Sequence, residues 1–211
     1  MIVAIDGPAG AGKSTVARAL AQRLGFRYLD TGAMYRALTW LALREGLPLD
    51  RGRELAALAR SHPVEFDERG RVRIAGVDVT ASIRETRIDR VVPVVARHRE
   101  VREVMRERQR ALGQAGDSVI EGRDIGAVVA PDAEVKVYLE ADPGERARRR
   151  AAERPGIGTD ALVTDLTARD RRDAANTHLA PEAVVIDTTE LTVDEVVDRI
   201  EALVRRAGAR A

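Results

Sequence analysis

The sequence predicts an α/β protein built on a five-stranded, parallel, doubly wound sheet. Short apolar runs typical of buried strands alternate with segments of helical spacing, which is the pattern of such sheets. The apolar run at 2–5 leads into a glycine-rich loop, and a helical segment follows at once. The chain has 211 residues, 45% of them hydrophobic, so it has the material for one domain carrying small inserts.

Each strand is expected from a short apolar run. The five expected strands cover 2–5, 26–29, 118–121, 135–139 and 183–186. Helical spacing between them predicts helices at about 13–24, 33–45, 52–61, 99–114, 143–153, 160–174 and 192–206. The last of these has its start marked by Thr192 as N-cap, with Glu195 at the third helical position.

One segment departs from the strand–helix alternation. Residues 64–67 and 72–79 have the pattern of short antiparallel strands, and a turn around Gly70 joins them. We therefore expect residues 62–98 to form a small insert that stands apart from the main sheet.

Composition excludes several classes of function. Lys+Arg (35) and Asp+Glu (34) nearly cancel and aromatic residues are 3%, so we expect no nucleic-acid partner. There are no cysteines, which excludes disulfides and thiolate metal sites, and the three histidines lack metal-ligand spacing. No apolar run approaches the ~20 residues of a membrane span, and the first strand begins at Ile2. These features predict a cytoplasmic protein without leader or membrane segment, and we expect a monomer.

The residues after the first strand match the phosphate-binding pattern G-x-x-x-x-G-K-[ST]. In such a loop the backbone N–H groups surround phosphates, the lysine reaches the β- and γ-phosphates, and the serine hydroxyl binds Mg²⁺. A glycine-rich turn that binds nothing is the alternative, and the flanking strand and helix disfavour it. The expected ATP-binding residues are Gly7, Pro8, Ala9, Gly10, Ala11, Gly12, Lys13, Ser14 and Thr15.

Other classes of phosphate-loop protein lack support. The chain has no Asn-Lys-x-Asp sequence, which GTP switch proteins need to recognise guanine. Residues 184–187 resemble the acidic strand end of motor ATPases, but two threonines follow Asp187. We expect Asp187 to serve a turn at the end of the strand.

Two further motifs place arginines at strand ends. Leu29–Arg36 follows the second strand and Glu121–Gly126 the third, and both lie at the edge of the sheet where open α/β folds bind ligands. Arg36 and Arg123 are suited to a second phosphate facing the ATP, and Asp124 to Mg²⁺ or the acceptor. The alternative is that both arginines form surface ion pairs worth ~0–1 kcal/mol.

These motifs resemble those of bacterial cytidylate kinases. The resemblance rests on Ile5–Ser14, Leu29–Arg36 and Glu121–Gly126. Shorter matching segments at 78–80, 83–84, 101–102 and 186–188 add to it. It implies a P-loop nucleoside monophosphate (NMP) kinase fold with an enlarged NMP-binding insert and a short lid. The implied core comprises residues 1–30, 115–143 and 161–211, the NMP-binding region 31–114 with the insert at about 62–98, and the lid about 144–160.

The resemblance also implies roles for individual residues. Those assigned to catalysis are Lys13, Arg123, Asp124 and Arg149, and those assigned to Mg²⁺ are Ser14 and Asp124. Those assigned to the acceptor nucleotide are Thr31, Arg36, Arg102, Arg123, Asp124, Arg169, Asp173 and Asn176. Among the lid arginines, Arg146, Arg149 and Arg150 share a helix face, whereas Arg148 is expected on a solvated face.

The implied reaction is ATP-dependent phosphorylation of CMP and dCMP to the diphosphates, with Mg²⁺. Two departures from the family pattern concern recognition of the base. Asn176 stands where the family usually has arginine, and Pro93 aligns with a serine. Two alternatives remain open: a P-loop kinase with another small acceptor such as UMP, and a regulatory module that binds ATP without transferring phosphate.

Overall fold

The computed structural model describes residues 1–67, 70–153, 159–174 and 177–209, without the side chains of residues 153, 159 and 169. Two compact units emerge from the backbone contacts. The first comprises residues 1–28 and 116–211, and the second residues 29–115. Each has its own hydrophobic core, so each is described by itself.

The first unit is organised by a five-stranded sheet of order β2-β6-β1-β7-β8, which confirms the predicted fold class. The strands of this sheet are β1 (Ile2–Asp6), β2 (Arg27–Asp30), β6 (Ser118–Gly122), β7 (Val135–Glu140) and β8 (Val184–Asp187), and the chain passes from the first unit to the second within β2. β1 pairs in parallel with β6 on one side and β7 on the other, and β7 pairs in parallel with β8. Because strand order reverses at β1, its carboxyl end is the place where such sheets bind ligands.

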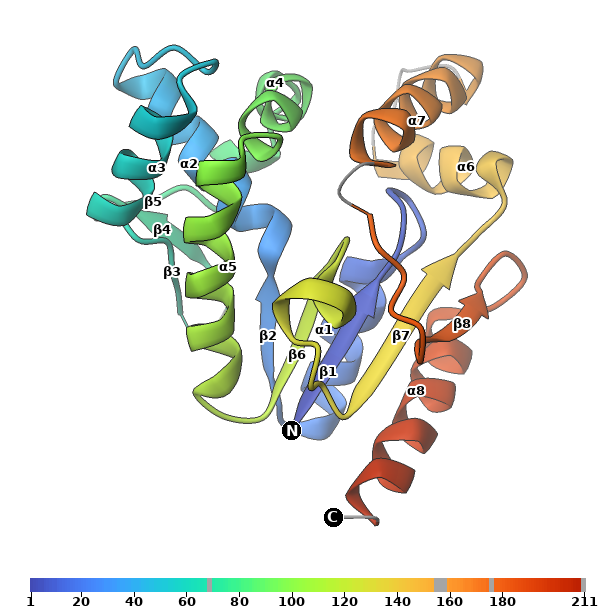
Figure 1. The fold of residues 1–211 in the computed structure, drawn as a ribbon. Coiled ribbons are helices and arrows are strands. Elements are labelled where there is room, and N and C mark those ends of the chain that lie inside the picture. The colour runs from blue at the N-terminus through green and yellow to red at the C-terminus, as the bar shows by residue number, and fades with distance from the viewer. Residues whose placement is uncertain (68–69, 154–158, 175–176, 210–211) are drawn as a thin grey trace. The chain divides into compact units, whose positions relative to one another are not determined.

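Helices of the first unit follow from amphipathic spacing. They are α1 (Lys13–Leu24), α6 (Pro143–Glu153), α7 (Thr159–Asp173) and α8 (Val193–Gly208), and a π-helical turn η2 (Ile125–Val129) follows β6. α1 buries Val16 and Leu20 and α8 buries Ile200 in one core with β1 and β7. Figure 1 shows α6 and α7 beyond the carboxyl end of β7, where they pack on each other.

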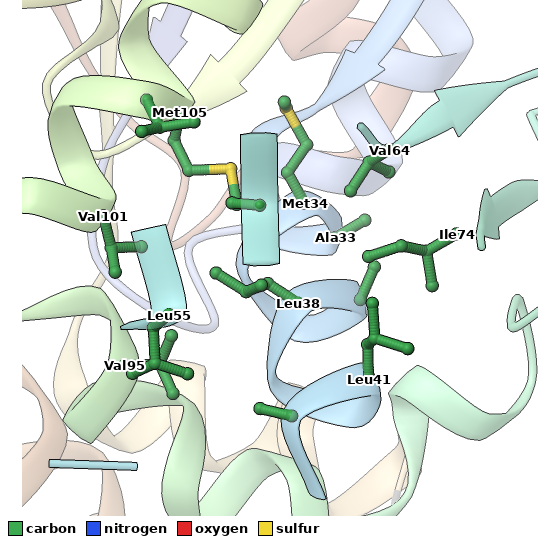
Figure 2. Packing of buried hydrophobic residues seen from close by; sticks show 14 of the residues in the cluster. Ala33, Met34, Leu38, Leu41, Leu55, Val64, Ile74, Val95, Val101 and Met105 are labelled. Carbon is green, nitrogen blue, oxygen red and sulfur yellow. The ribbon is translucent and has the colours of Figure 1, made fainter. Parts of the chain in front are cut away.

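The second unit packs helices around a small sheet of its own. Its elements are α2 (Thr31–Arg44), α3 (Gly52–Ser61), β3 (Glu65–Phe66), β4 (Val72–Ile74), β5 (Val77–Asp78), the 3₁₀ turn η1 (Ser82–Arg84), α4 (Thr86–Ala96) and α5 (Arg99–Gln114). The strands form a separate antiparallel sheet of order β3-β4-β5, as expected for the insert. Figure 2 shows part of the core, to which α2, α3, α4 and α5 all contribute.

Two details of the second unit differ from expectation. α2 begins at Thr31, two residues early, because the Asp30 carboxylate accepts a hydrogen bond from the Ala33 amide (2.8 Å) and caps the helix. The second half of the insert contains α4, where no helix was expected. Ile88, Val92 and Val95 lie along one face of α4 and are buried, so tertiary packing stabilises this helix.

Candidate active site

The glycine loop connects β1 to α1, and its glycines are sterically required. Gly7, Gly10 and Gly12 have φ values of 149°, 79° and 88°. A Cβ on Gly7 would lie 2.1 Å from the Leu139 carbonyl oxygen, and one on Gly10 would lie 3.0 Å from the Arg146 Cβ. The loop can therefore take this path only with glycine at these positions.

Two side chains hold loop carbonyls from within and beside the loop. The Lys13 ammonium donates to the Pro8 oxygen at 2.8 Å. The Thr188 hydroxyl, at the end of β8, lies 3.3 Å from the Ala11 oxygen and 3.0 Å from the Glu140 oxygen. The Ile186–Thr188 phrase of the sequence thus joins the loop to the end of the sheet.

Arg123 connects the loop to α7. Its guanidinium donates to the Gly7 oxygen at 2.8 Å and forms an ion pair with Asp173, also at 2.8 Å. Both side chains of the pair are only about one-fifth exposed, so this is a partly buried contact rather than a surface one. Arg123 and Asp173, both assigned to the acceptor by the resemblance, therefore lie side by side.

The arginines of α6, which the resemblance assigns to a lid, differ in their contacts. Arg146 is buried, donates to the Ala9 oxygen at 3.0 Å and pairs with Asp170 at 2.7 Å. Arg148, on the exposed side, contacts Glu145 alone among the described residues. α6 therefore has one buried face and one solvated face, as the helical spacing of its arginines predicts.

Arg149 is the α6 arginine that lies near Gly12 of the loop. Its Nη1 lies 3.6 Å from the position of a Cβ on Gly12, and its guanidinium donates to the Thr188 hydroxyl (3.0 Å) and carbonyl (2.6 Å). Its Nε donates to Glu145 at 2.8 Å. The pKa of Glu145 is lowered to about 2, first by the hydrogen bond from Arg148 and further by Arg149. Glu145 is therefore ionised at neutral pH and orients Arg149.

Asp6 positions the turn that carries Arg123 and Asp124. Its two carboxylate oxygens accept from the amides of Ile125 and Gly126, both at 2.9 Å. Burial raises the pKa of Asp6 to about 6, the two amides oppose the shift, and the charge of Asp124 adds to it. Two acidic side chains thus share one buried region beside the loop lysine.

Ser14, the second residue of α1, lies beside a third buried carboxylate. Its hydroxyl donates to Glu121 at 2.9 Å, and the Tyr28 hydroxyl donates to the other oxygen of Glu121. No group of three His, Cys, Asp or Glu side chains with metal-binding geometry occurs within the described residues. A serine hydroxyl with carboxylates nearby still fits Mg²⁺, which typically takes one or two protein oxygens and completes its shell with waters and phosphate oxygens.

In the second unit, α2 carries two of the residues assigned to the acceptor. Thr31 is the first residue of the helix and is buried. Arg36 pairs with Asp89 of α4 and donates to the Ile83 oxygen at 3.2 Å. Both members of this pair are about nine-tenths buried, so the surface-pair alternative does not describe it.

Arg102 and the remaining acceptor residues complete the set. Arg102 is buried on α5 and its guanidinium lies 3.4 Å from the oxygen of Ala96, the last residue of α4. Arg36 and Arg102 thus both contact α4, one near each end. Asn176 and the side chain of Arg169 lie outside the described residues.

Three functional side chains have roles that sequence reasoning did not assign. They are Asp6, Glu121 and Thr188, which hold the 123–126 turn, Ser14 and the loop. For Asp6 a signal existed, since a carboxylate that ends a buried strand just before a phosphate loop must find a partner. The other two depend on pairings between distant segments.

Comparison with known proteins identifies the family of this chain. The cytidylate kinase family profile matches residues 3–206. The chain belongs to the cytidylate kinase family. A cytidylate kinase of Geobacillus sp. (strain WCH70) is 46% identical over 96% of this chain and 95% of its own length. That of Shouchella clausii (strain KSM-K16) is 47% identical, with the same coverage.

Longer relatives contain a matching region. A "bifunctional pantoate ligase/cytidylate kinase" of Synechococcus sp. (strain JA-3-3Ab) is 46% identical over 97% of this chain, which spans 41% of that protein. Among solved structures, a shikimate kinase from Bacteroides thetaiotaomicron matches with a TM-score of 0.51 and 18% identity over 97% of this chain and 98% of that chain. A Sinorhizobium meliloti gluconokinase matches with a TM-score of 0.50 and 14% identity, covering 98% and 93%. These structures support the fold alone.

Proposed function

We propose that this protein transfers the γ-phosphoryl group of ATP to CMP or dCMP, with Mg²⁺, giving ADP and the diphosphate. The observation that carries the proposal is the glycine loop at the carboxyl end of β1, whose carbonyls are held by Lys13, Arg123 and Arg146. A loop anchored through its carbonyls suits phosphate binding through its amides. The family supplies the acceptor, since its named relatives are cytidylate kinases.

Catalysis in this proposal is positioning and charge stabilisation. The transition state of phosphoryl transfer spreads negative charge over the transferred group, so fixed cations around it lower the barrier. Lys13, Arg123 and Arg149 are assigned to that group. Arg149 suits the role because Glu145 and Thr188 hold its guanidinium beside Gly12.

Ser14 and Asp124 are assigned to Mg²⁺, with Glu121 orienting the serine hydroxyl. When bound, the ion neutralises charge on the β- and γ-phosphates. The acceptor oxygen is already anionic at neutral pH, so the protein needs no strong general base.

For the acceptor nucleotide we propose the residues that the resemblance assigns to it, namely Thr31, Arg36, Arg102, Arg123, Asp124, Arg169, Asp173 and Asn176. Arg36, whose guanidinium is held by Asp89 and the Ile83 oxygen, is proposed to bind the acceptor phosphate. The division into core, NMP-binding region and lid, the cytoplasmic location, the monomeric state and the absence of nucleic-acid partners are also proposals. Within the described residues, no helix combines the length and apolarity of a membrane span.

The test is a panel of CMP, dCMP, UMP and AMP with Mg-ATP, read out as ADP formation. We expect CMP and dCMP to stimulate ADP formation most strongly, and Lys13→Ala to abolish the stimulation while the fold persists. The strongest response from UMP or AMP would contradict the assigned acceptor. ATP binding without ADP formation on any acceptor would indicate the regulatory module instead.

A further inference from the structure

Asp170 of α7 is connected to the glycine loop through one arginine of α6. The Asp170 carboxylate pairs with the Arg146 guanidinium at 2.7 Å, and the same guanidinium donates to the Ala9 oxygen at 3.0 Å. The side chain of Arg146 is only 8% exposed and that of Asp170 is 30% exposed. A carboxylate outside the loop thus reaches a loop carbonyl through a single buried cation.

Packing holds the same stretch of the loop against α6 and α7. The Ala9 side chain packs on a small apolar cluster formed by Ala147, Leu162 and Leu166. At the next residue, a Cβ on Gly10 would lie 3.0 Å from both the Cβ and the carbonyl oxygen of Arg146. Residues 9–10 are therefore in direct contact with α6, and a displacement of the Arg146 side chain acts on the loop without an intermediate.

A second aspartate of α7 has the same arrangement, three residues further along the helix. Asp173 pairs with Arg123 at 2.8 Å, and Arg123 donates to the Gly7 oxygen at 2.8 Å. Residues three apart lie on the same side of a helix, so α7 directs Asp170 and Asp173 to two arginines that hold the same loop. The family resemblance assigns Asp173 and Arg123 to the acceptor nucleotide, whereas it assigns no role to Asp170.

The position of the Arg146 guanidinium depends on Asp170. Its Nε atom and the Oδ1 atom of Asp170 are buried and have no hydrogen-bond partner among the residues that the structure describes. Within those residues the guanidinium is held by Asp170 and by the Ala9 oxygen. A buried guanidinium that loses its carboxylate is left with an uncompensated charge, which favours its movement towards water. Neutralising Asp170 should therefore release the Ala9 oxygen.

We propose that Asp170 is a positioning residue for the ATP-binding loop, acting through Arg146 on the Ala9 carbonyl. The negative charge of Asp170 keeps the guanidinium on the loop. Arg146 then shapes the loop, although it shares a face of α6 with Arg149, which is assigned to the transferred group. The inference rests on the proposed binding of ATP at this loop and adds to it a residue that determines ATP affinity.

The sign of one substitution tests the proposal. Asp170→Asn keeps the shape of the side chain and removes its charge, so it should raise the dissociation constant of Mg-ATP about tenfold, because the charge-assisted contact that holds Arg146 is lost. If Arg146 instead binds a phosphate directly, loss of the competing carboxylate should leave the affinity unchanged or increase it, and that result overturns the proposal. Isothermal titration calorimetry of the full chain without CMP measures the constant, and the fitted stoichiometry gives the folded fraction.

A double variant tests whether Asp170 acts through Arg146. Arg146→Gln should also raise the dissociation constant of Mg-ATP, and combining it with Asp170→Asn should weaken binding no further. A combined effect equal to the product of the two single effects overturns the assigned route. Asp165→Asn, at an exposed position earlier on α7, is the matched control and should change the constant by less than about twofold.

Steady-state kinetics separate this inference from the proposed reaction. Asp170→Asn should raise KM for Mg-ATP about tenfold and change KM for CMP by less than about twofold, a difference that a general loss of structure would not give. Equal increases in both constants overturn the positioning role. A wild-type protein that binds Mg-ATP but does not phosphorylate CMP would contradict the proposed function alone, because the calorimetric test of Asp170 needs no acceptor. Failure of the wild type to bind Mg-ATP would overturn both.

Discussion

Asp6 is the residue on which the geometry of the 123–126 turn depends. Its carboxylate accepts two amide hydrogen bonds in a buried position and holds a pKa of about 6, against an ordinary value of 3.8. Between those values the folded state binds a proton that the unfolded state releases. Asp6 therefore makes the protein less stable as pH rises from about 4 to 6, and the full effect is present above the folded pKa.

The pH dependence gives a prediction. A shift of about two pKa units corresponds to roughly 3 kcal/mol of unfolding free energy in total, of which about 2 kcal/mol is lost between pH 4.5 and 7. Asp6→Asn removes this slope, so the difference in stability between variant and wild type should change by about 2 kcal/mol over that range. Urea unfolding at pH 4.5, 5.5 and 7 measures it, and parallel curves would contradict the raised pKa. Asp187, whose pKa is lowered first by the Thr189 hydroxyl, should contribute with the opposite sign.

Arg148 and Arg149 are neighbours on α6 with different surroundings, which makes a matched pair. Arg149 contacts Thr188 beside the loop, whereas Arg148 is exposed and contacts Glu145. We expect Arg149→Ala to lower kcat about 10²-fold, because a preorganised donor to the transferred group is lost. Arg148→Ala should change kcat by less than about threefold. Steady-state kinetics with CMP and Mg-ATP decide, and equal effects would refute the assignment of Arg149.

How far single residues can be predicted depends on the type of motif. The glycine loop is a local pattern, so its residues and its place between strand and helix follow from sequence. The contact of Arg146 with Ala9, and that of Glu121 with Ser14, join segments more than a hundred residues apart. Spacing along the chain carries no signal for such pairs.

At the scale of elements, α4 shows why one helix escaped prediction. Val91, Val92, Val94 and Val95 flank Pro93, and both β-branched residues and an interior proline disfavour helix. The burial of Val92 and Val95 outweighs these local preferences. Helices with strong amphipathic spacing, such as α3 and α5, were predicted with their observed bounds.

The start of α8 was predicted from its capping residues, and a mutation at the cap tests their contribution to stability. The Thr192 hydroxyl accepts from the Glu195 amide at 3.3 Å, and the Glu195 carboxylate accepts from the Thr192 amide at 2.8 Å. Removing this capping box by Thr192→Ala should cost about 1 kcal/mol of unfolding free energy. Thr167→Ala, at an exposed position within α7, serves as control and should be neutral or slightly stabilising. Urea unfolding measures both, and an equal loss would show that the cap contributes nothing.

At the scale of the whole molecule, the two large hydrophobic cores seen in the described residues, one in each unit, have no member in common. Ile83 is fully buried in one and Ile200 in the other. Ile83→Val and Ile200→Val should each cost about 0.5–1.5 kcal/mol, since each deletes one buried methylene. Because the two sites share no packing partner, the double variant should equal the sum within about 0.5 kcal/mol. Urea unfolding of all four proteins decides, and a larger deviation would reveal coupling between the cores.

The anchored carbonyls of the glycine loop have a consequence for its donors. In a trans peptide the C=O and the following N–H point in opposite directions. Fixing the oxygens of Pro8 and Ala9 on side chains therefore turns the N–H groups of the next residues away from those side chains. The Gly7 oxygen precedes a proline, so anchoring it orients no donor at all. The backbone N–H groups of the loop are thus oriented before an anion binds, so the loop loses little conformational freedom on binding.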